Sequence, residues 1–301
     1  MPLDPQIAGL VDAINAAAAD APPREEQDAA YRRAGYLALS AIPGPGPELD
    51  SVSDLEIAGV PCRRYANEGA VGCFVYIHGG GYCIGDLDTH DQVCRQLALE
   101  SEATVIAIHY RLAPEHPFPA GLDDAWAVLK AIDADRAAHG AEAGLVVGGD
   151  SAGGNFSAVL SLMARDAGLE LDAQLLVYPG VDMDDDSPSM SENGEGYVLT
   201  REGMDWFTEQ YRADRDDWRA SPINAESHAG VAPALVITAE FDPLRDQGVR
   251  YAEKLRADGV EVTHTNYDGV VHVFFQLGPI CDAGARSVTE VATAARDALR
   301  N

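Results

Sequence analysis

Short apolar runs alternate with helical patterns along most of this chain, and this alternation restricts the fold more than any other feature of the sequence. The apolar runs predict strands and cover residues 72–77, 104–110, 145–149, 174–178, 234–240 and 260–267. Helical periodicity lies between them, at about 90–100, 119–134, 151–166, 245–258 and 283–299. Nearly continuous apolar strands that alternate with helices indicate an α/β protein with a mainly parallel central sheet and helices on both faces. In such a sheet, ligands bind beyond the carboxyl ends of the strands.

The predicted strand at 145–149 ends in a serine flanked by glycines. Gly149, Ser151 and Gly153 fit the G-x-S-x-G pattern of a nucleophile elbow, a sharp strand-to-helix turn that exposes the serine. The turn strains the serine backbone, and the residues two positions away must lack a Cβ to avoid collision. Ser151 would stand at the N-terminus of the next helix, where the dipole favours negative charge. A glycine-rich turn without a nucleophile has the same pattern, so other residues must decide.

A second glycine motif follows the first predicted strand, where His78 precedes Gly79, Gly80 and Gly81. Successive glycines let backbone N–H groups point into a cavity, and this arrangement supplies an oxyanion hole together with the N–H of the residue after the nucleophile, Ala152. The sequence leaves open which two of the three glycines donate. A phosphate-binding loop is the alternative, but neither G-x-x-x-x-G-K-[ST] nor G-x-G-x-x-G is completed.

A serine nucleophile needs a base, and in this arrangement the chain order is serine, then acid, then histidine. His272 follows the last predicted strand and is the expected base. The alternatives are His228, which precedes a strand, and His264, which lies within one.

The expected acid is Asp242, which directly follows the predicted strand 234–240. Glu240 and Asp246 are the alternatives, but Glu240 is still in the strand and Asp246 falls in the next helix. We expect two nearby features to be architectural. Asp150 is a candidate structural hydrogen-bonding residue, and the proline-containing segment 110–119 is a candidate support for the glycine loop.

Two segments lie outside the alternating pattern. Helical periodicity at 3–19 and 25–39 is followed by a run of prolines and glycines at 41–47, which predicts a linker. The interval 182–221 is too long for a simple connection. We predict an N-terminal helical cap segment at 1–47 and a catalytic domain at 48–301, with a cap insertion at about 182–221.

The formal net charge of −28 over 301 residues excludes nucleic acid as an expected partner, because phosphate binding depends on Lys and Arg. No apolar stretch predicts a signal peptide or a membrane span. The five cysteines are scattered without a C-x-x-C pair, which argues against a disulfide framework and a zinc site. We therefore expect a cytoplasmic protein with no cofactor and no metal.

These motifs together resemble the hormone-sensitive-lipase-like family of bacterial esterases, also called family IV, within the α/β hydrolases. The similar segments are 78–81, 110–116, 149–154, 192–200 and 242–246. The resemblance implies an α/β hydrolase fold with a helical cap, a nucleophile at Ser151, an acid at Asp242 and a base at His272. It also implies an oxyanion hole from glycines 79–81 and Ala152, and a possible homodimer. The family commonly has glycine where this chain has Val273.

We therefore expect a serine carboxylesterase that hydrolyses small-molecule esters of short to medium acyl chain through an acyl-enzyme intermediate. An amidase or an acyltransferase with the same triad is the first alternative. A non-catalytic ligand-binding receptor is the alternative from another class, and it is disfavoured because such receptors lack the catalytic histidine, whereas His272 is present.

Overall fold

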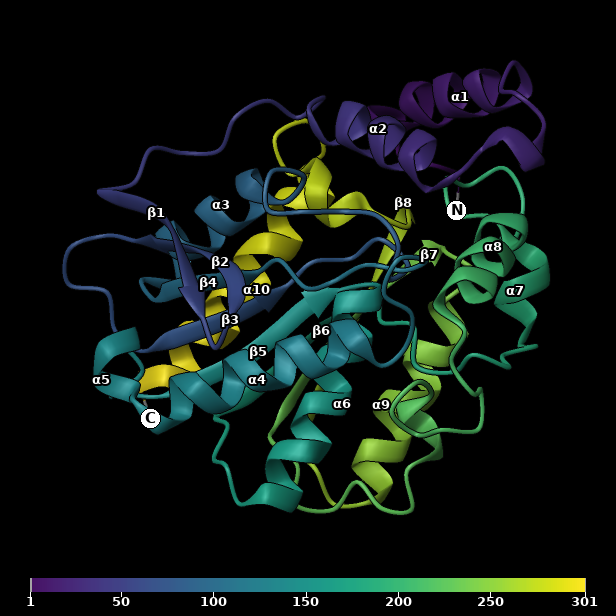
Figure 1. Cartoon of the computed structure of the whole chain (residues 1–301). Helices are drawn as coiled ribbons and strands as arrows, with labels where there is room; N and C mark the ends of the chain where they lie inside the picture. The colour runs from purple at the N-terminus through teal and green to yellow at the C-terminus, as the bar shows by residue number, and fades with distance from the viewer. Residues whose placement is uncertain (1, 301) are drawn as a thin grey trace.

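The computed structural model describes residues 2–300, which form one eight-stranded sheet covered by helices (Figure 1). The strand order is β1-β2-β4-β3-β5-β6-β7-β8. The neighbouring strands from β4 to β8 are all parallel, while the pairs β1–β2 and β2–β4 are antiparallel. The carboxyl ends of six strands therefore meet at one edge, where a doubly wound sheet binds its ligands.

The strands are β1 (Ser51–Ile57), β2 (Val60–Ala66), β3 (Cys73–Ile77), β4 (Thr104–Ile108), β5 (Leu145–Asp150), β6 (Ala173–Val177), β7 (Ala234–Phe241) and β8 (Val262–Val271). The α-helices are α1 (Pro5–Ala19), α2 (Ala29–Ser40), α3 (Asp91–Ser101), α4 (Ala120–Ala134), α5 (Arg136–His139), α6 (Ala152–Ala167), α7 (Pro188–Glu192), α8 (Arg201–Tyr211), α9 (Arg245–Ala257) and α10 (Asp282–Arg300). Short 3-10 helices are η1 (Arg24–Glu26), η2 (Pro222–Asn224) and η3 (Phe274–Leu277).

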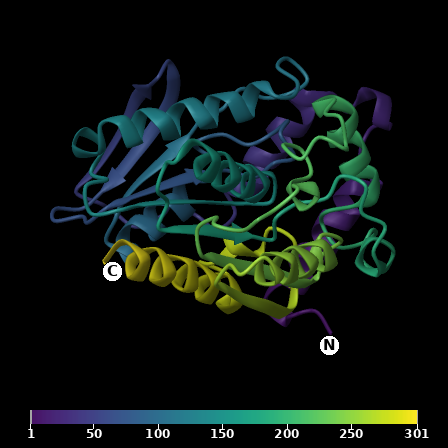
Figure 2. The ribbon, with the colours of Figure 1, turned by 90° about the horizontal axis from the view of Figure 1, so that it is seen from below.

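Helices cover both faces of the sheet, as Figure 2 shows with α10 below and α4 above the strands. Helices α3 and α10 pack on one face, while α4, α6 and α9 pack on the other. Each residue of β3, β4 and β6 is buried, because both sides of these strands are covered. The prediction of a mainly parallel sheet with helices on both faces is confirmed.

The six predicted strands are present, but the prediction omitted β1 and β2. These two strands form a hairpin at one side of the sheet, with Ala58 and Gly59 at its turn. Only Ile57 is buried in β1, and Asp54 and Glu56 are exposed, so the continuous apolar run that identified the other strands is missing. The predicted helix at 25–39 was also too long. It begins at Ala29, because the Asp28 side chain accepts the N–H of Tyr31 and caps it.

The N-terminal helices and the segment that contains α7 and α8 lie together at the end of the molecule where β7 and β8 finish (Figures 1 and 2). Arg24 forms an ion pair with Glu209 of α8, at 3.0 Å. The Arg32 guanidinium lies 4.5 Å from the centre of the Trp206 ring. Within residues 2–300, no helix is both long enough and apolar enough to cross a membrane.

Candidate active site

Ser151 occupies the sharp turn between β5 and α6, with φ +55° and ψ −117°. The flanking glycines explain why the turn can form. A Cβ on Gly149 would lie 2.1 Å from the carbonyl oxygen of Ile77, and a Cβ on Gly153 would lie 1.9 Å from the same atom. The elbow therefore packs directly on the end of β3, and only glycine permits that approach. Ser151 is the residue before α6, so its hydroxyl stands at the helix N-terminus.

Three side chains form a continuous hydrogen-bonded chain at the carboxyl edge of the sheet. The Ser151 hydroxyl donates to His272 Nε2 at 2.9 Å, and His272 Nδ1 donates to Asp242 Oδ2 at 2.7 Å. The second oxygen of Asp242 accepts the N–H of Leu244 at 2.8 Å. Asp242 and His272 are buried, whereas Ser151 is partly exposed. This geometry can move a proton from the serine hydroxyl to an imidazole that a carboxylate orients.

The alternative bases lie elsewhere. His228 is buried and contacts the carboxylate of Asp258, and His264 contacts Thr238 at 3.0 Å. The alternative acids also lie in other elements. Glu240 lies in β7 and accepts the N–H of Gly269, while Asp246 lies in α9. The hydrogen-bond partners of His272 are instead Asp242 and Ser151.

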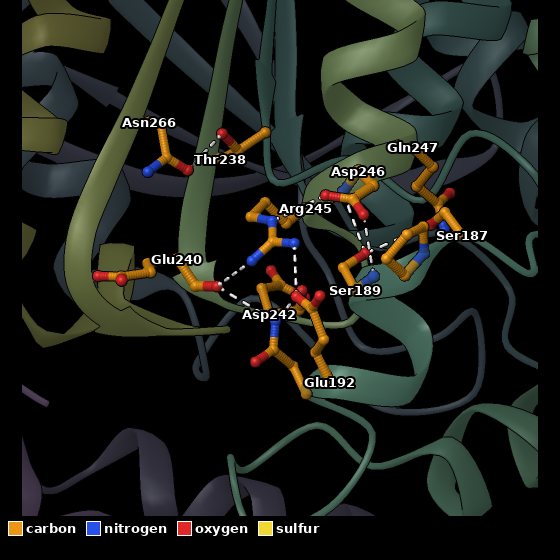
Figure 3. A network of polar contacts seen from close by, with 12 residues as sticks. Ser187, Ser189, Glu192, Thr238, Glu240, Asp242, Arg245, Asp246, Gln247 and Asn266 are labelled. Carbon is orange, nitrogen blue, oxygen red and sulfur yellow. Dashed lines mark hydrogen bonds and ion pairs between the residues drawn. The ribbon is translucent and has the colours of Figure 1, made fainter. Parts of the chain in front are cut away.

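The loop that carries Asp242 is tied to the interval 182–221 by a polar network (Figure 3). Ser189 of α7 donates its hydroxyl to the carbonyl of Pro243 at 2.8 Å, and its N–H donates to Asp246 Oδ2 at 2.9 Å. Arg245 donates to Glu192 at 2.9 Å and to the carbonyl of Glu240 at 3.2 Å. The contacts of Pro243 with Ser189 and of Arg245 with Glu192 join residues 54 and 53 positions apart, so no spacing in the sequence indicates them.

The three glycines after β3 do not present equivalent N–H groups. The Gly79 N–H donates at 3.0 Å to Asp150 Oδ1, at the end of the neighbouring strand β5. The N–H groups of Gly80, Gly81 and Ala152 make no hydrogen bond within residues 2–300. Ala152 is the first residue of α6, where no intrahelical acceptor exists. Three free donors therefore remain beside the Ser151 hydroxyl.

Asp150 is the centre of a buried polar cluster beneath Ser151. Its carboxylate accepts from the Tyr76 hydroxyl at 2.6 Å and lies 3.3 Å from His90 Nε2. Gln276 donates to the same carboxylate at 3.3 Å and to the Tyr36 hydroxyl at 2.7 Å. Burial alone would raise the pKa of Asp150, but His90 and the hydrogen bonds from Tyr76 and the loop N–H hold it at about 2. Asp150 is thus a charged structural group.

The segment 110–119 supports the glycine loop, as expected. The Tyr110 hydroxyl donates to the carbonyl of His78 at 3.0 Å, and the two rings stack at 4.3 Å. Burial and the neighbouring His90 lower the pKa of His78 to about 3, so its ring is neutral. Arg111 is anchored by Asp124 at 2.7 Å.

Tyr178 was missed in the sequence, although it follows β6 directly. Its ring centre lies 4.4 Å from that of His272, and its backbone has φ +33°. The Tyr178 side chain is buried, and its hydroxyl has no partner within residues 2–300. Only its place after a strand of the parallel sheet could have indicated a position near the base.

Ser151 lies between two cavities. The smaller one has a volume of about 100 Å³ and contains Met183, Met190 and Met204 in its wall. The larger one has a volume of about 520 Å³, extends beneath α1 and α2, and includes His272 in its wall. A groove of about 900 Å³ opens beside α10 at the amino ends of β6, β7 and β8, away from these side chains.

Known proteins of this fold resemble the chain over most of its length. The family model described as alpha/beta hydrolase fold matches residues 74–276. The chain is 42% identical to the carboxylic ester hydrolase LipN of Mycobacterium tuberculosis, over 90% of this chain and 77% of that protein. It is 36% identical to the ethyl acetate hydrolase of Pseudomonas putida, over 99% of this chain and 100% of that protein. The solved structure of a hyperthermophilic esterase from the archaeon Pyrobaculum calidifontis superposes with a TM-score of 0.93, at 37% identity and 99% coverage of both chains.

Proposed function

The chain belongs to the alpha/beta hydrolase fold family, and within that family we propose that it is a serine carboxylesterase with Ser151 as nucleophile, His272 as base and Asp242 as acid. The similarity to hormone-sensitive-lipase-like bacterial esterases extends over nearly the whole chain. Its reaction is the hydrolysis of carboxylic esters. The observation that carries the proposed roles is the hydrogen-bonded chain from Ser151 Oγ through His272 to Asp242, at 2.9 and 2.7 Å.

The reaction follows from this geometry. Ser151 Oγ attacks the ester carbonyl while its proton passes to His272 Nε2. The resulting oxyanion accepts hydrogen bonds from the free N–H groups of Gly80, Gly81 and Ala152. His272 then returns the proton to the leaving alcohol oxygen as the tetrahedral intermediate collapses to the acyl-enzyme. A water molecule attacks the acyl-enzyme through the same base, and this step releases the carboxylic acid and regenerates Ser151.

Gly79 has a different role in this proposal. Its N–H is held by Asp150, so it anchors the glycine loop instead of binding the oxyanion. The Asp150 carboxylate is fixed from several elements, and the loop is thereby held in the position that presents the next two N–H groups. Preorganised donors of this kind need no rearrangement when charge develops.

The substrates are small-molecule esters. We propose a preference for short to medium acyl chains, because the smaller cavity beside Ser151 has a volume of only about 100 Å³. The segments 1–47 and 182–221 would form the cap that closes the site above the carboxyl edge. Cation–π and ion-pair contacts between α8 and the N-terminal region support this division.

Two finer proposals concern assembly and location. Within residues 2–300, β8 is the last strand of the sheet, and its edge offers a surface on which two copies could pair as a homodimer. Sedimentation would measure that state. All five cysteines are buried and unpaired, which is consistent with the reducing cytoplasm.

Ser151→Ala tests the assignment directly. We expect the rate of ester hydrolysis to fall by several orders of magnitude with the fold intact, because only the oxyanion hole and substrate binding remain. Ser161→Ala is the matched control, because Ser161 is buried in the same helix away from the turn. An organophosphate should label Ser151 alone. Substantial hydrolysis or labelling in Ser151→Ala would place the nucleophile elsewhere.

An amidase or acyltransferase would use the same triad. Comparing hydrolysis with transfer to an added alcohol, and esters with amides of the same acyl group, separates these activities. A receptor without catalysis would bind esters but release no acid in the same assay.

A further inference from the structure

The proton path assigns the two cavities to the two sides of the ester. His272 must deliver its proton to the leaving alcohol oxygen, so that oxygen has to lie on the side of Ser151 that faces the imidazole. The larger cavity includes both His272 and Ser151 in its wall, whereas the smaller one includes Ser151 and Ala152 but not His272. The alcohol portion therefore occupies the larger cavity, and the acyl portion occupies the smaller one.

Two valines in the wall of the larger cavity have an unusual backbone. Val198 has φ +64° and Val273 has φ +71°. Eight residues other than glycine have positive φ within the described chain, and these two alone are β-branched. The left-handed region brings Cβ close to the backbone carbonyl, and β-branched residues in it are true outliers. Both outliers line the cavity that contains Ser151 and His272.

The local structure requires the positive φ in each case. At Val198, the N–H of Leu199 donates to the carbonyl of Tyr197 at 2.7 Å, which closes a three-residue turn. With positive φ at its centre, this is the rare, strained form of the γ-turn. The turn is held in place by the Tyr197 ring, which stacks on Phe241 at 4.9 Å.

At Val273, the chain passes from β8 and the base into η3. The carbonyl of Val273 accepts the N–H of Gln276 at 3.0 Å and begins that short helix. Glycine would adopt either backbone without strain. The chain instead has valine at 198 and 273, and both side chains are partly exposed and form part of the cavity wall beside the base. Strain that persists at an active site points to a function for the strained residue.

We propose that Val198 and Val273 are specificity-determining residues that narrow the alcohol side of the site and disfavour esters of bulky alcohols. This inference rests on the proposed esterase function. One methylene in a hydrophobic pocket changes the specificity ratio by about 10–200-fold, so removing an entire isopropyl group should have a measurable effect. Both valines lie in the wall of the cavity, and neither takes part in the hydrogen bonds of the triad.

The first experiment compares ethyl acetate with cyclohexyl acetate in the full-length protein. In Val273→Gly and in Val198→Gly, the ratio of kcat/KM for cyclohexyl over ethyl acetate should rise at least about 10-fold. The ratio for ethyl hexanoate over ethyl acetate should remain as in the unmodified protein. Met204→Ala is the converse control, because Met204 lines only the smaller cavity. It should change the hexanoate ratio and leave the cyclohexyl ratio unchanged.

The second experiment measures backbone strain separately from activity. Val273→Gly and Val273→Ala both remove the two methyl groups, but alanine keeps the Cβ that makes positive φ costly. The glycine variant should therefore melt about 2–4 °C above the alanine variant, the reverse of the order at an ordinary backbone position.

The outcomes are distinct. A cyclohexyl ratio that stays within twofold in both glycine variants overturns the proposal, and so does a shift confined to the acyl series. An alanine variant that melts above the glycine variant removes the strain on which the inference is based. If the unmodified protein hydrolyses none of these esters, the proposed function fails, while the melting comparison still measures the strain.

Discussion

Asp150→Asn tests whether the buried carboxylate beneath Ser151 stabilises the fold through its charge. The amide oxygen can keep the hydrogen bonds from the Tyr76 hydroxyl and the Gly79 N–H. The new NH₂ group would face Gln276 Nε2, which donates to the carboxylate in the unmodified protein. Loss of a charged acceptor from a buried hydrogen bond lowers the free energy of unfolding by about 1.5–3 kcal/mol. Removing one member of a buried ion pair, here the contact between Asp150 and His90, lowers it by about 3–5 kcal/mol. We expect a loss of about 2–4 kcal/mol at pH 7.

The pKa of Asp150 gives a second value for the contribution of its charge to the free energy of unfolding. It lies at about 2 in the folded protein, against a reference of 3.8. Since each unit corresponds to about 1.36 kcal/mol, the ionised carboxylate contributes about 2 kcal/mol. The folded pKa is lowered, so this contribution is fully present above pH 4 and is lost as the pH falls toward 2. At pH 3, about 1 kcal/mol of it should have disappeared.

Urea denaturation followed by tryptophan fluorescence measures both effects. The free energy of unfolding should be lower in Asp150→Asn than in the unmodified protein, and the difference should shrink by about 1 kcal/mol between pH 7 and pH 3. Asp172→Asn is the matched control. Asp172 accepts the N–H of Leu145 at the other end of β5, but it is exposed. A difference below about 0.5 kcal/mol at pH 7, or one that is equal at both pH values, would refute the reasoning.

Three further predictions follow from the site and the charge. Gly153→Ala should abolish the folded elbow, because its Cβ would lie 1.9 Å from the Ile77 carbonyl oxygen. Circular dichroism and esterase activity should both show the loss, and an active, fully folded variant would contradict this packing. Asp242→Asn should lower kcat by about 10⁴-fold with the fold retained, as measured by steady-state kinetics, since the amide favours the wrong imidazole tautomer. The net charge of −28 should make the melting temperature rise from low to about 1 M NaCl, where the Debye length is only about 3 Å and repulsion is screened. The ratio of hydrolysis rates for neutral over anionic esters should fall along the same series. A steadily falling melting temperature or a constant ratio would count against this prediction.

The sequence predicted the elements that depend on short-range requirements. The strand-to-helix turn at Ser151 needs glycines two residues away, and both glycines pack against Ile77 in the structure. The order of serine, aspartate and histidine after successive strands follows from a parallel sheet, in which those strand ends share one edge. The hairpin of β1 and β2 escaped prediction, because its first strand is half-exposed and charged, with Asp54 and Glu56 in its solvent-facing positions.

Only the tertiary structure decided which atoms meet. Ser151 and His272 are 121 positions apart, and β6 and β7 lie between their strands β5 and β8, so their 2.9 Å contact needs the loop after β8 to reach back to the elbow. The glycine motif by itself shows three equivalent N–H groups. Asp150, 71 positions away from Gly79, occupies one of them and leaves the other two free.

Some of these features can be predicted from the sequence and others cannot, and the difference has a physical reason. Steric limits on φ and ψ, and the need for a missing Cβ, act between neighbouring residues, so the sequence records them as fixed spacings such as that of Gly149, Ser151 and Gly153. Strain at Val198 and Val273 is the opposite case, because nothing in their spacing requires a positive φ. The turn at Val198 is held by the stacking of Tyr197 on Phe241 of β7, and that contact exists only after the sheet and the segment 182–221 have packed together.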